Sequence, residues 1–519
     1  MKRLLPALAA LLVLQAPATG AYLIFPDGDT SLKGDTKSAH EAYKKGNFAE
    51  ALRMFKAEAA RGDKEAQFAL GRIYEEGGAA EASSAMAENW YRKAAQQGHA
   101  SAQFNLAVLL LNSRGRAAEG IEWMRKSADS GSSRAMLTLG GMNINGTGMD
   151  KNSAEARKWL EKAAGSGEPE AYDALGQMYE AGEGVDKSPA KAVEMYESAA
   201  KRDFVKSMLR LGLIHLNGLG VEKDGSKAVE WFKRATEKGN VEGMMALGTM
   251  YATGTGVEKK AEEAVTWFRK AAETGDVSGC TKLADAYASG EGIAADDKKA
   301  MEWYTKAAEK GGAAAMYAIS EFHEKGRGVE ASSKETVRWT VRAALTGLPL
   351  AQREMGKRYR TGKDVNKDTV VAQSWFTRAA YGGDPESALT VADMLITGEG
   401  GLPSDPKTAK SILTRAAELG MVEAQLKLAD YCEKGLDGRP DLIRAYALAL
   451  ATGENENGKQ LRTALEKKMT KEQLDQAKKE YDRLKSAPPA EKPSDKPVAP
   501  ATPAGPVPAA TDPGKKPVP

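Results

Sequence analysis

The chain has 519 residues, of which 28% are charged and 42% hydrophobic, and its formal net charge is only +3. This length is too great for one round hydrophobic core, so we expect an extended core or several domains. The balanced charge argues against a nucleic-acid partner, and two cysteines are too few for a disulfide-stabilised scaffold.

The first 21 residues have the layout of a secretory signal peptide. Two basic residues precede an apolar run from Leu4 to Leu14, and small residues follow it. The run is too short to span a bilayer, so we expect a signal peptide over residues 1–21, cleaved between Ala18 and Tyr22. An uncleaved anchor or a buried helix is the alternative. The mature chain is then exported, periplasmic or secreted, and has no transmembrane segment.

A 36-residue period fills the middle of the chain. All eight tryptophans fall at one position of this period, with one interval of 33 and one gap of 72 where Met195 replaces Trp: Trp90, Trp123, Trp159, Trp231, Trp267, Trp303, Trp339 and Trp375. A small residue recurs with the same period, as at Gly140, Gly176, Gly212 and Gly248. Such self-similarity predicts a stack of equivalent structural units.

Residues 241–276 show what one unit is. One face of a first helix carries residues at helical spacing, which are Met244, Leu247, Gly248 and Tyr251. A second helix buries another such set, which is Ala264, Trp267, Phe268 and Ala271. Glycine enters left-handed conformations without steric cost, so glycines end both helices: Gly254, Gly256 and Gly275. A single hairpin of this kind buries too little apolar area to offset the conformational entropy lost on folding. The units must therefore stack.

The unit resembles the Sel1-like repeat, a relative of the tetratricopeptide repeat with a longer loop between its helices. The resemblance rests on the pattern A-x-x-x-L-G-x-x-Y-x-x-G-x-G-V, followed by A-x-x-W-F-x-K-A-A-x-x-G, and covers about residues 37–486. It implies an all-α, right-handed α-solenoid with ten repeats in residues 64–421. A tetratricopeptide-like cap hairpin (37–63) precedes them, and a partial repeat with C-terminal capping helices (422–486) follows.

The Gly-x-Gly loops do not indicate a nucleotide site. Seven copies lie between two helices, whereas a dinucleotide fingerprint needs one copy between a strand and a helix. The ninth repeat departs from the pattern, with Gly362-Lys363-Asp364 where a second glycine is expected. At the other periodic glycine, after the second helix, Asp203 is the exception.

Eleven of the 21 prolines lie in residues 487–519. This composition cannot form a core, so we expect a disordered, Pro/Ala/Lys-rich tail. A spacer, or a tail that contacts peptidoglycan or envelope proteins, is favoured over a peptide ligand.

Candidate chemistry is sparse. Disulfide-rich members of the Sel1-like family are described as penicillin-binding or β-lactamase-like, which makes Ser-x-x-Lys motifs of interest. Two such motifs occur in this chain, beginning at Ser188 and Ser404. Both precede a second helix, where serine is a preferred N-cap, as Asp224 and Asp297 would be elsewhere. The four histidines have no ligand spacing, so neither a metal nor a cofactor is expected. Cys280 and Cys432 lie four repeats apart and are interpreted as buried apolar residues.

First helices line the concave side of such stacks. The side chains at the positions equivalent to Met245 and Thr249 should point outward from the core, into the concave groove. The predicted partner-binding residues run from apolar through acidic to basic: Leu209, Leu213, Met245, Thr249, Thr281, Asp285, Tyr317, Glu321, Arg353 and Lys357. This series suits a protein or an extended peptide. Ordinary solvated helix faces are the alternative interpretation.

The sequence therefore predicts an exported, non-enzymatic scaffold of the bacterial cell envelope that binds proteins through a helical groove. In one version of this hypothesis it regulates an envelope enzyme or sensor. The rival hypothesis is a cell-wall enzyme or a β-lactam-binding, β-lactamase-like protein.

Overall fold

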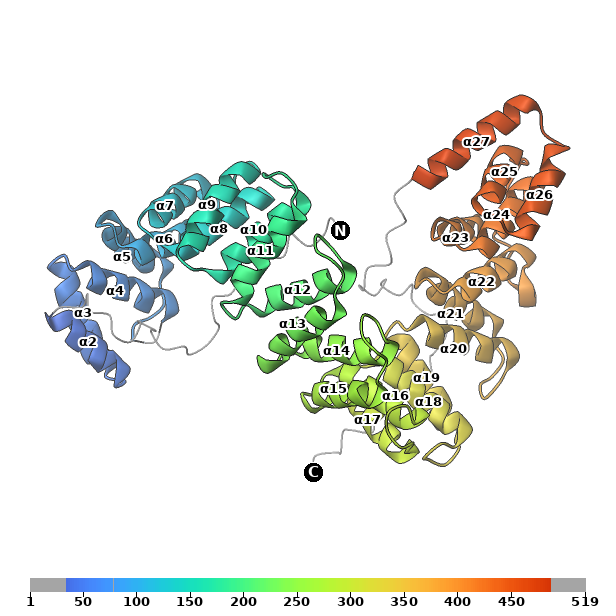
Figure 1. Cartoon of the computed structure of the whole chain (residues 1–519), viewed down its shortest axis with the longest axis horizontal. Coiled ribbons are helices and arrows are strands. Elements are labelled where there is room, and N and C mark those ends of the chain that lie inside the picture. Colours follow the sequence, from blue (N-terminus) through green and yellow to red (C-terminus); the bar gives the residue numbers. More distant parts are fainter. Residues whose placement is uncertain (1–33, 78, 487–519) are drawn as a thin grey trace. The chain divides into compact units, whose positions relative to one another are not determined.

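The computed structural model describes residues 34–77 and 79–486, and every regular element in these ranges is a helix (Figure 1). The predicted signal peptide (1–21) and proline-rich tail (487–519) lie outside the described residues. The chain divides into two compact units, with the division inside helix α14 (Val241–Thr253).

The first unit holds the cap hairpin and the early repeats. Its helices pair as successive hairpins, and the second helix of each hairpin packs on the first helix of the next. Their bounds are α2 (Gly34–Lys44), α3 (Phe48–Ala60), α4 (Lys64–Glu76), α5 (Ser84–Gln96), α6 (Ala100–Leu111), α7 (Ala117–Asp129), α8 (Ser133–Asn145), α9 (Ser153–Gly165), α10 (Pro169–Ala181), α11 (Pro189–Ala200), α12 (Val205–Asn217) and α13 (Gly225–Glu237).

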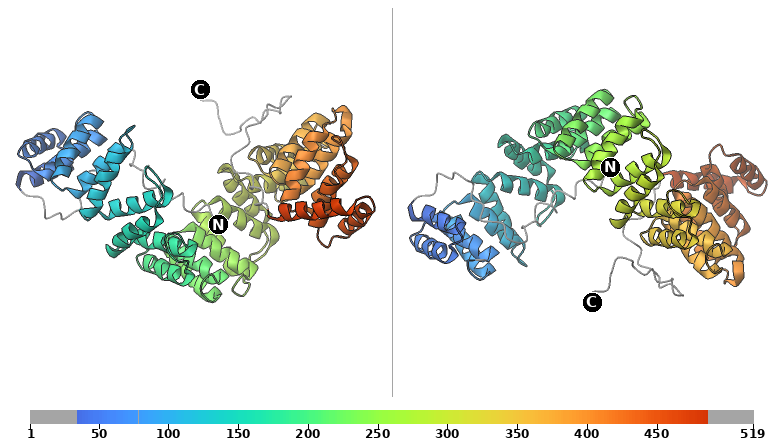
Figure 2. Two further views of the ribbon diagram at one scale, coloured as in Figure 1. Left: turned by 90° about the horizontal axis from the view of Figure 1, so that it is seen from above. Right: turned by 90° about the horizontal axis from the view of Figure 1, so that it is seen from below.

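The second unit begins within α14 and repeats the same arrangement, which Figure 2 shows from two further directions. Its other helices are α15 (Ala261–Glu273), α16 (Val277–Ser289), α17 (Asp297–Glu309), α18 (Ala313–Lys325), α19 (Ser333–Leu345), α20 (Pro349–Thr361), α21 (Thr369–Tyr381), α22 (Pro385–Thr397), the 3-10 turn η1 (Glu399–Gly401), α23 (Pro406–Glu418), α24 (Val422–Lys434), α25 (Leu442–Ala451), α26 (Glu456–Glu466) and α27 (Lys471–Ser486). The predicted all-α solenoid of stacked hairpins is confirmed.

Most hairpin loops are closed by an equivalent hydrogen bond. The backbone N–H of the residue that caps the second helix donates to a carbonyl near the end of the first helix, for example Asp224 to His215 at 2.8 Å and Asp296 to Tyr287 at 2.9 Å. Glycine in the left-handed conformation ends the first helix, as at Gly218. The Gly-x-Gly loops are therefore helix ends and turns, as their repetition predicted.

Within a hairpin, the periodic glycine of the first helix lies against the residue that follows the tryptophan. A methyl group at Gly212 would lie 2.5 Å from the ring of Phe232, and one at Gly248 equally close to Phe268. Glycine is therefore required because the aromatic ring lies directly on the first-helix backbone. The interpretation that placed Trp267 beside Phe268 in the core needs correction, since Phe268 is buried while Trp267 is half-buried.

The tryptophans instead lie at the joints between repeats. Trp375 packs into the core of the preceding repeats, and Trp123 contacts two neighbouring core clusters. In every case a Lys or Arg three residues later covers the ring, with its charge 3.8–5.0 Å from the ring centre. A cation over an indole face is attracted by the negative face of the ring, so the charge covers each ring, including the buried rings of Trp159 and Trp375.

Two aspartates adopt the left-handed backbone conformation that glycine usually takes. Asp203 has φ 62° and Asp364 has φ 61°, and among the described residues they are the only non-glycine residues with positive φ. These are the two positions where the sequence replaces a periodic glycine with aspartate. The repeat geometry therefore imposes the glycine conformation even where the glycine is lost.

Candidate protein-interaction surface

In the first unit, the outward face of α12 carries the predicted apolar residues. Leu213 is 45% exposed, and Leu219, just beyond the helix, is 48% exposed. Leu209 is half-buried against a core cluster, and Leu216 is also half-buried. Leucines so exposed leave apolar area in water, which is the type of surface that a partner covers.

In the second unit, the predicted residues of α14 and α16 are more polar. Met245 is half-buried and Thr249 is exposed. Thr281 is half-buried, and its hydroxyl donates to the backbone oxygen of Val277. Asp285 accepts a 2.7 Å hydrogen bond from the hydroxyl of Tyr304, whose ring is buried.

Core tyrosines thus reach the outward face of the first helices. The hydroxyls of Tyr91 and Tyr196 donate in the same way, to Glu75 at 2.5 Å and Glu180 at 2.9 Å. Burial is the main cause that raises the pKa of these tyrosines far above its usual value, and the neighbouring carboxylates raise it further. Several carboxylates of this face are therefore already used as hydrogen-bond acceptors for the core.

The predicted basic residues lie on α20 and are paired with the next repeat. Arg353 lies 2.9 Å from Asp384 and 3.0 Å from Glu386, and Lys357 lies 2.6 Å from Glu386. Carboxylates at the cap and in the first turn of α22 therefore offset much of the positive charge expected here. On α18, Glu321 is paired with Lys325 at 3.6 Å, and burial followed by nearby carboxylates raises the pKa of Tyr317 to about 12.

The pattern of charges along each single helix does not predict this pairing, because the partners lie on different helices. In a stacked array, positions about 30 residues apart are neighbours, and their opposite charges meet across the repeat boundary. Arg210 and Glu180 form such a pair on α12 and α10, with bonds of 2.7 and 2.8 Å. The signal was present as complementary charges in consecutive repeats.

A buried charge cluster in the ninth repeat was also missed. Arg358 is 1% exposed, although Met178, Met250 and Met394 fill the equivalent position of other repeats. Three carboxylates surround its guanidinium, at 2.7 Å for Asp364, 3.0 Å for Glu324 and 3.1 Å for Glu354. A buried cation requires such compensation.

The strained Asp364 is explained by this cluster. It occupies the position of the second loop glycine, and its carboxylate reaches Nη1 of Arg358 from there. Hydrogen bonds from Lys363 and then from Arg358 lower the pKa of Glu324. Two separate departures in the sequence, the buried arginine and the lost glycine, are therefore one structural feature.

Neither Ser-x-x-Lys motif forms a serine–lysine side-chain pair. Ser188 is the N-cap of α11 and accepts from the backbone N–H of Lys191. Ser404 is not the cap that the sequence suggested, because Asp405 caps α23 and the Ser404 hydroxyl donates to the Ile396 carbonyl.

The predicted cap Asp297 is also displaced by one residue. Asp296 caps α17, while Asp297 begins the helix and pairs with Arg327. The carboxylate that satisfies the first backbone N–H groups of α17 therefore comes from one residue earlier.

Both cysteines are buried and unpaired, as expected, and burial raises the pKa of the Cys432 thiol to about 11. Across residues 34–77 and 79–486 no cluster of three side chains could hold a metal ion. In the same ranges, none of the helices combines the length and apolar character needed to cross a bilayer.

The repeat geometry agrees with a comparison against protein families. Eleven consecutive segments match the Sel1 repeat: 64–99, 100–132, 133–168, 169–204, 205–240, 241–276, 277–312, 313–347, 349–384, 385–421 and 422–452. The chain belongs to the Sel1 repeat family. The family is generally non-enzymatic, and Sel1 repeat proteins generally mediate protein–protein interactions.

Solved structures include related chains. The protective antigen c5321 of uropathogenic Escherichia coli, which displays an SLR fold, is 29% identical, with a TM-score of 0.51 over 83% of this chain and 94% of that one. A Sel1 repeat protein from Oxalobacter formigenes is 32% identical, with a TM-score of 0.44 over 66% of this chain and 89% of that one. No match was found among curated proteins.

Proposed function

We propose that this Sel1 repeat protein is an exported scaffold that binds proteins or extended peptides of the cell envelope through the outward faces of its first helices. The observation that carries the proposal is the row of leucines on and beside α12, with Leu213 and Leu219 nearly half exposed. Export is supported by the layout of residues 1–21, and the tail provides a further contact with peptidoglycan or envelope proteins.

The binding mode follows from the spacing of the exposed residues. Leu209, Leu213 and Leu216 are three to four residues apart and form one stripe along the helix. An apolar side chain of the partner gains free energy by covering this stripe. The paired charges on α20 provide orientation rather than net attraction, because Arg353 and Lys357 already have carboxylate partners.

Site-specific photo-crosslinking in intact cells tests the proposal. A photoreactive residue replaces Leu213, and a matched control replaces Lys233, an exposed residue on the second helix of the same repeat. We expect a defined crosslinked partner from position 213 only. The purified partner should then bind Leu213→Glu about tenfold more weakly than the parent chain, the effect of losing one well-packed apolar contact.

Equal crosslinking from both positions would remove the assignment to the first-helix face. Export is tested separately, by fusing alkaline phosphatase after residue 40 with and without residues 1–21. Activity that is independent of residues 1–21 would contradict export.

A further inference from the structure

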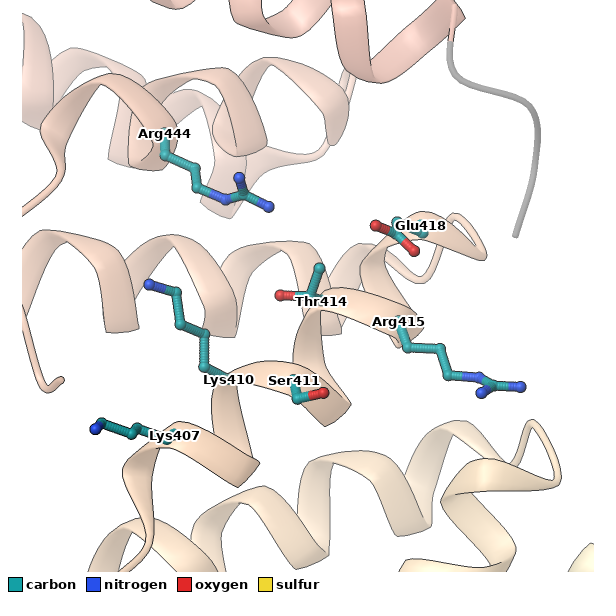
Figure 3. Close-up of a pocket in the computed structure, with 7 residues that line it drawn as sticks. All are labelled: Lys407, Lys410, Ser411, Thr414, Arg415, Glu418 and Arg444. Carbon is teal, nitrogen blue, oxygen red and sulfur yellow. The ribbon is translucent and has the colours of Figure 1, made fainter. Parts of the chain in front are cut away.

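A second surface, on the opposite side of the hairpins from the first helices, has a different chemistry. An open hollow of about 680 Å³ lies between α23 and α25 in the second unit. Lys407, Lys410 and Arg415 line it from α23, and Arg444 projects into it from α25 (Figure 3). Glu418 is the one carboxylate of the lining, and Ser411 and Thr414 add hydroxyl groups.

The cations of this hollow are incompletely neutralised. Among the described residues, neither Lys407 nor Arg415 has a carboxylate within 4 Å, whereas Lys410 pairs with Asp437 at 2.9 Å. The nearest carboxylate of Arg444 belongs to Glu480, 3.8 Å away on α27. The hollow therefore has a surplus of positive charge, unlike α20, where the next repeat supplies partners.

A break in the tryptophan pattern explains why Arg415 is available. Ile412 stands where the equivalent second helices carry tryptophan, so Arg415 has no indole three residues before it. Its guanidinium instead lies over the ring of Tyr381 on the preceding second helix, 5.7 Å from the ring centre. Tyr381 is 36% exposed, so an aromatic surface adjoins the basic hollow.

We propose that this hollow binds an extended acidic segment of a partner protein, which is a second interaction surface independent of the first-helix face. The basic stripe on α23 runs from Lys407 to Arg415 and is about 12 Å long, at 1.5 Å per helical residue. An extended segment of about four residues spans this length. The cations are distributed along the stripe rather than converging on one point, which favours several carboxylates over a single small anion.

The chain's own C-terminal segment is a poorer occupant. Residues 487–519 contain more lysines than acidic residues, so their charge does not complement the hollow. An acidic segment with an apolar or aromatic residue at one end fits better, since that residue would contact Tyr381 while the carboxylates meet Arg415, Lys407 and Arg444.

Fluorescence anisotropy with the full mature chain tests this proposal. The probe is a fluorescein-labelled peptide of alternating glutamate and alanine, and the glutamine version serves as the uncharged control. The variant Lys407→Glu/Arg415→Glu should weaken binding of the glutamate peptide about tenfold or more. The matched variant Arg269→Glu/Lys298→Glu makes the same charge change at exposed positions of other second helices, and should weaken it less than about threefold through long-range charge alone.

Each alternative has its own result. Equal weakening by both variants would replace the site by general electrostatic attraction. Displacement of the peptide by inorganic phosphate at similar concentration would assign the hollow to small anions instead. Binding that appears only after deletion of residues 487–519 would make the tail its occupant. Loss of the first-helix crosslink from Leu213 would leave this proposal unaffected.

Discussion

The ninth and tenth repeats form the same hairpin around opposite core chemistry. In the tenth repeat Met394 fills the equivalent position and belongs to an apolar core cluster. In the ninth repeat Arg358 occupies this position, and Asp364, Glu324 and Glu354 surround it. The difference shows that a repeat can bury a charged side chain when carboxylates come both from the loop of that repeat and from the preceding repeat.

Removing the buried cation should have the largest effect. Arg358→Ala leaves a cavity and three clustered carboxylates, and we expect a loss of about 3–5 kcal/mol in stability of the ninth repeat. Hydrogen exchange of amides in α20 and α21 measures this locally, since long repeat arrays do not unfold in a single step.

Arg358→Met is the matched control, because methionine already fills this position in other repeats. Replacing a buried ion pair with a well-packed apolar side chain is often neutral or stabilising, so we expect a change within about 1 kcal/mol. If the methionine variant were as unstable as the alanine variant, the cluster would be essential to the hairpin rather than a substitute for methionine.

The glycine under the aromatic ring should have the next largest effect. A methyl group at Gly356 would lie 2.8 Å from the ring of Phe376, so Gly356→Ala should destabilise the ninth repeat by about 1–3 kcal/mol. The tenth repeat has Ala392 at this position, opposite the smaller Leu413. The double variant Gly356→Ala/Phe376→Leu should therefore recover part of the loss, as measured by hydrogen exchange of amides in α20 and α21. A double variant less stable than the alanine variant alone would show that the ring is not the obstacle.

Asp364→Gly separates backbone strain from charge pairing. In the parent chain it relieves a left-handed aspartate but removes a carboxylate from Arg358, and we expect a net loss of about 1 kcal/mol. Combined with Arg358→Met, the same change should stabilise by about 1 kcal/mol, because only the relief of strain remains. A change of the same sign in both backgrounds, measured by hydrogen exchange, would mean that Asp364 and Arg358 are not coupled.

The sequence predicted the hairpin, its period and its glycine turns because these are local and repeat many times. It did not predict which aromatic is deepest, because Trp267 and Phe268 are adjacent and both apolar. It also missed the ion pairs of Arg353 and Lys357, which depend on contacts between consecutive repeats. The expected gradient of charge along the first helices was therefore too simple, although the exposure of Leu213 agrees with its expected outward position.

Asp203→Gly should have the smallest effect and the opposite sign. Asp203 has the same left-handed backbone as Asp364 but no buried arginine, and its carboxylate pairs only with the exposed Lys238 at 2.7 Å. Such surface pairs contribute little, so relief of backbone strain should dominate and stabilise the fourth repeat by about 0.5–1 kcal/mol. Slower exchange of amides at the end of α11 would show this gain.

Asp203→Ala is the control, since it removes the same carboxylate but keeps the strain, and it should not stabilise. If alanine and glycine stabilised equally, the carboxylate rather than the backbone would be the unfavourable element, and the contrast with Asp364 would rest on charge alone.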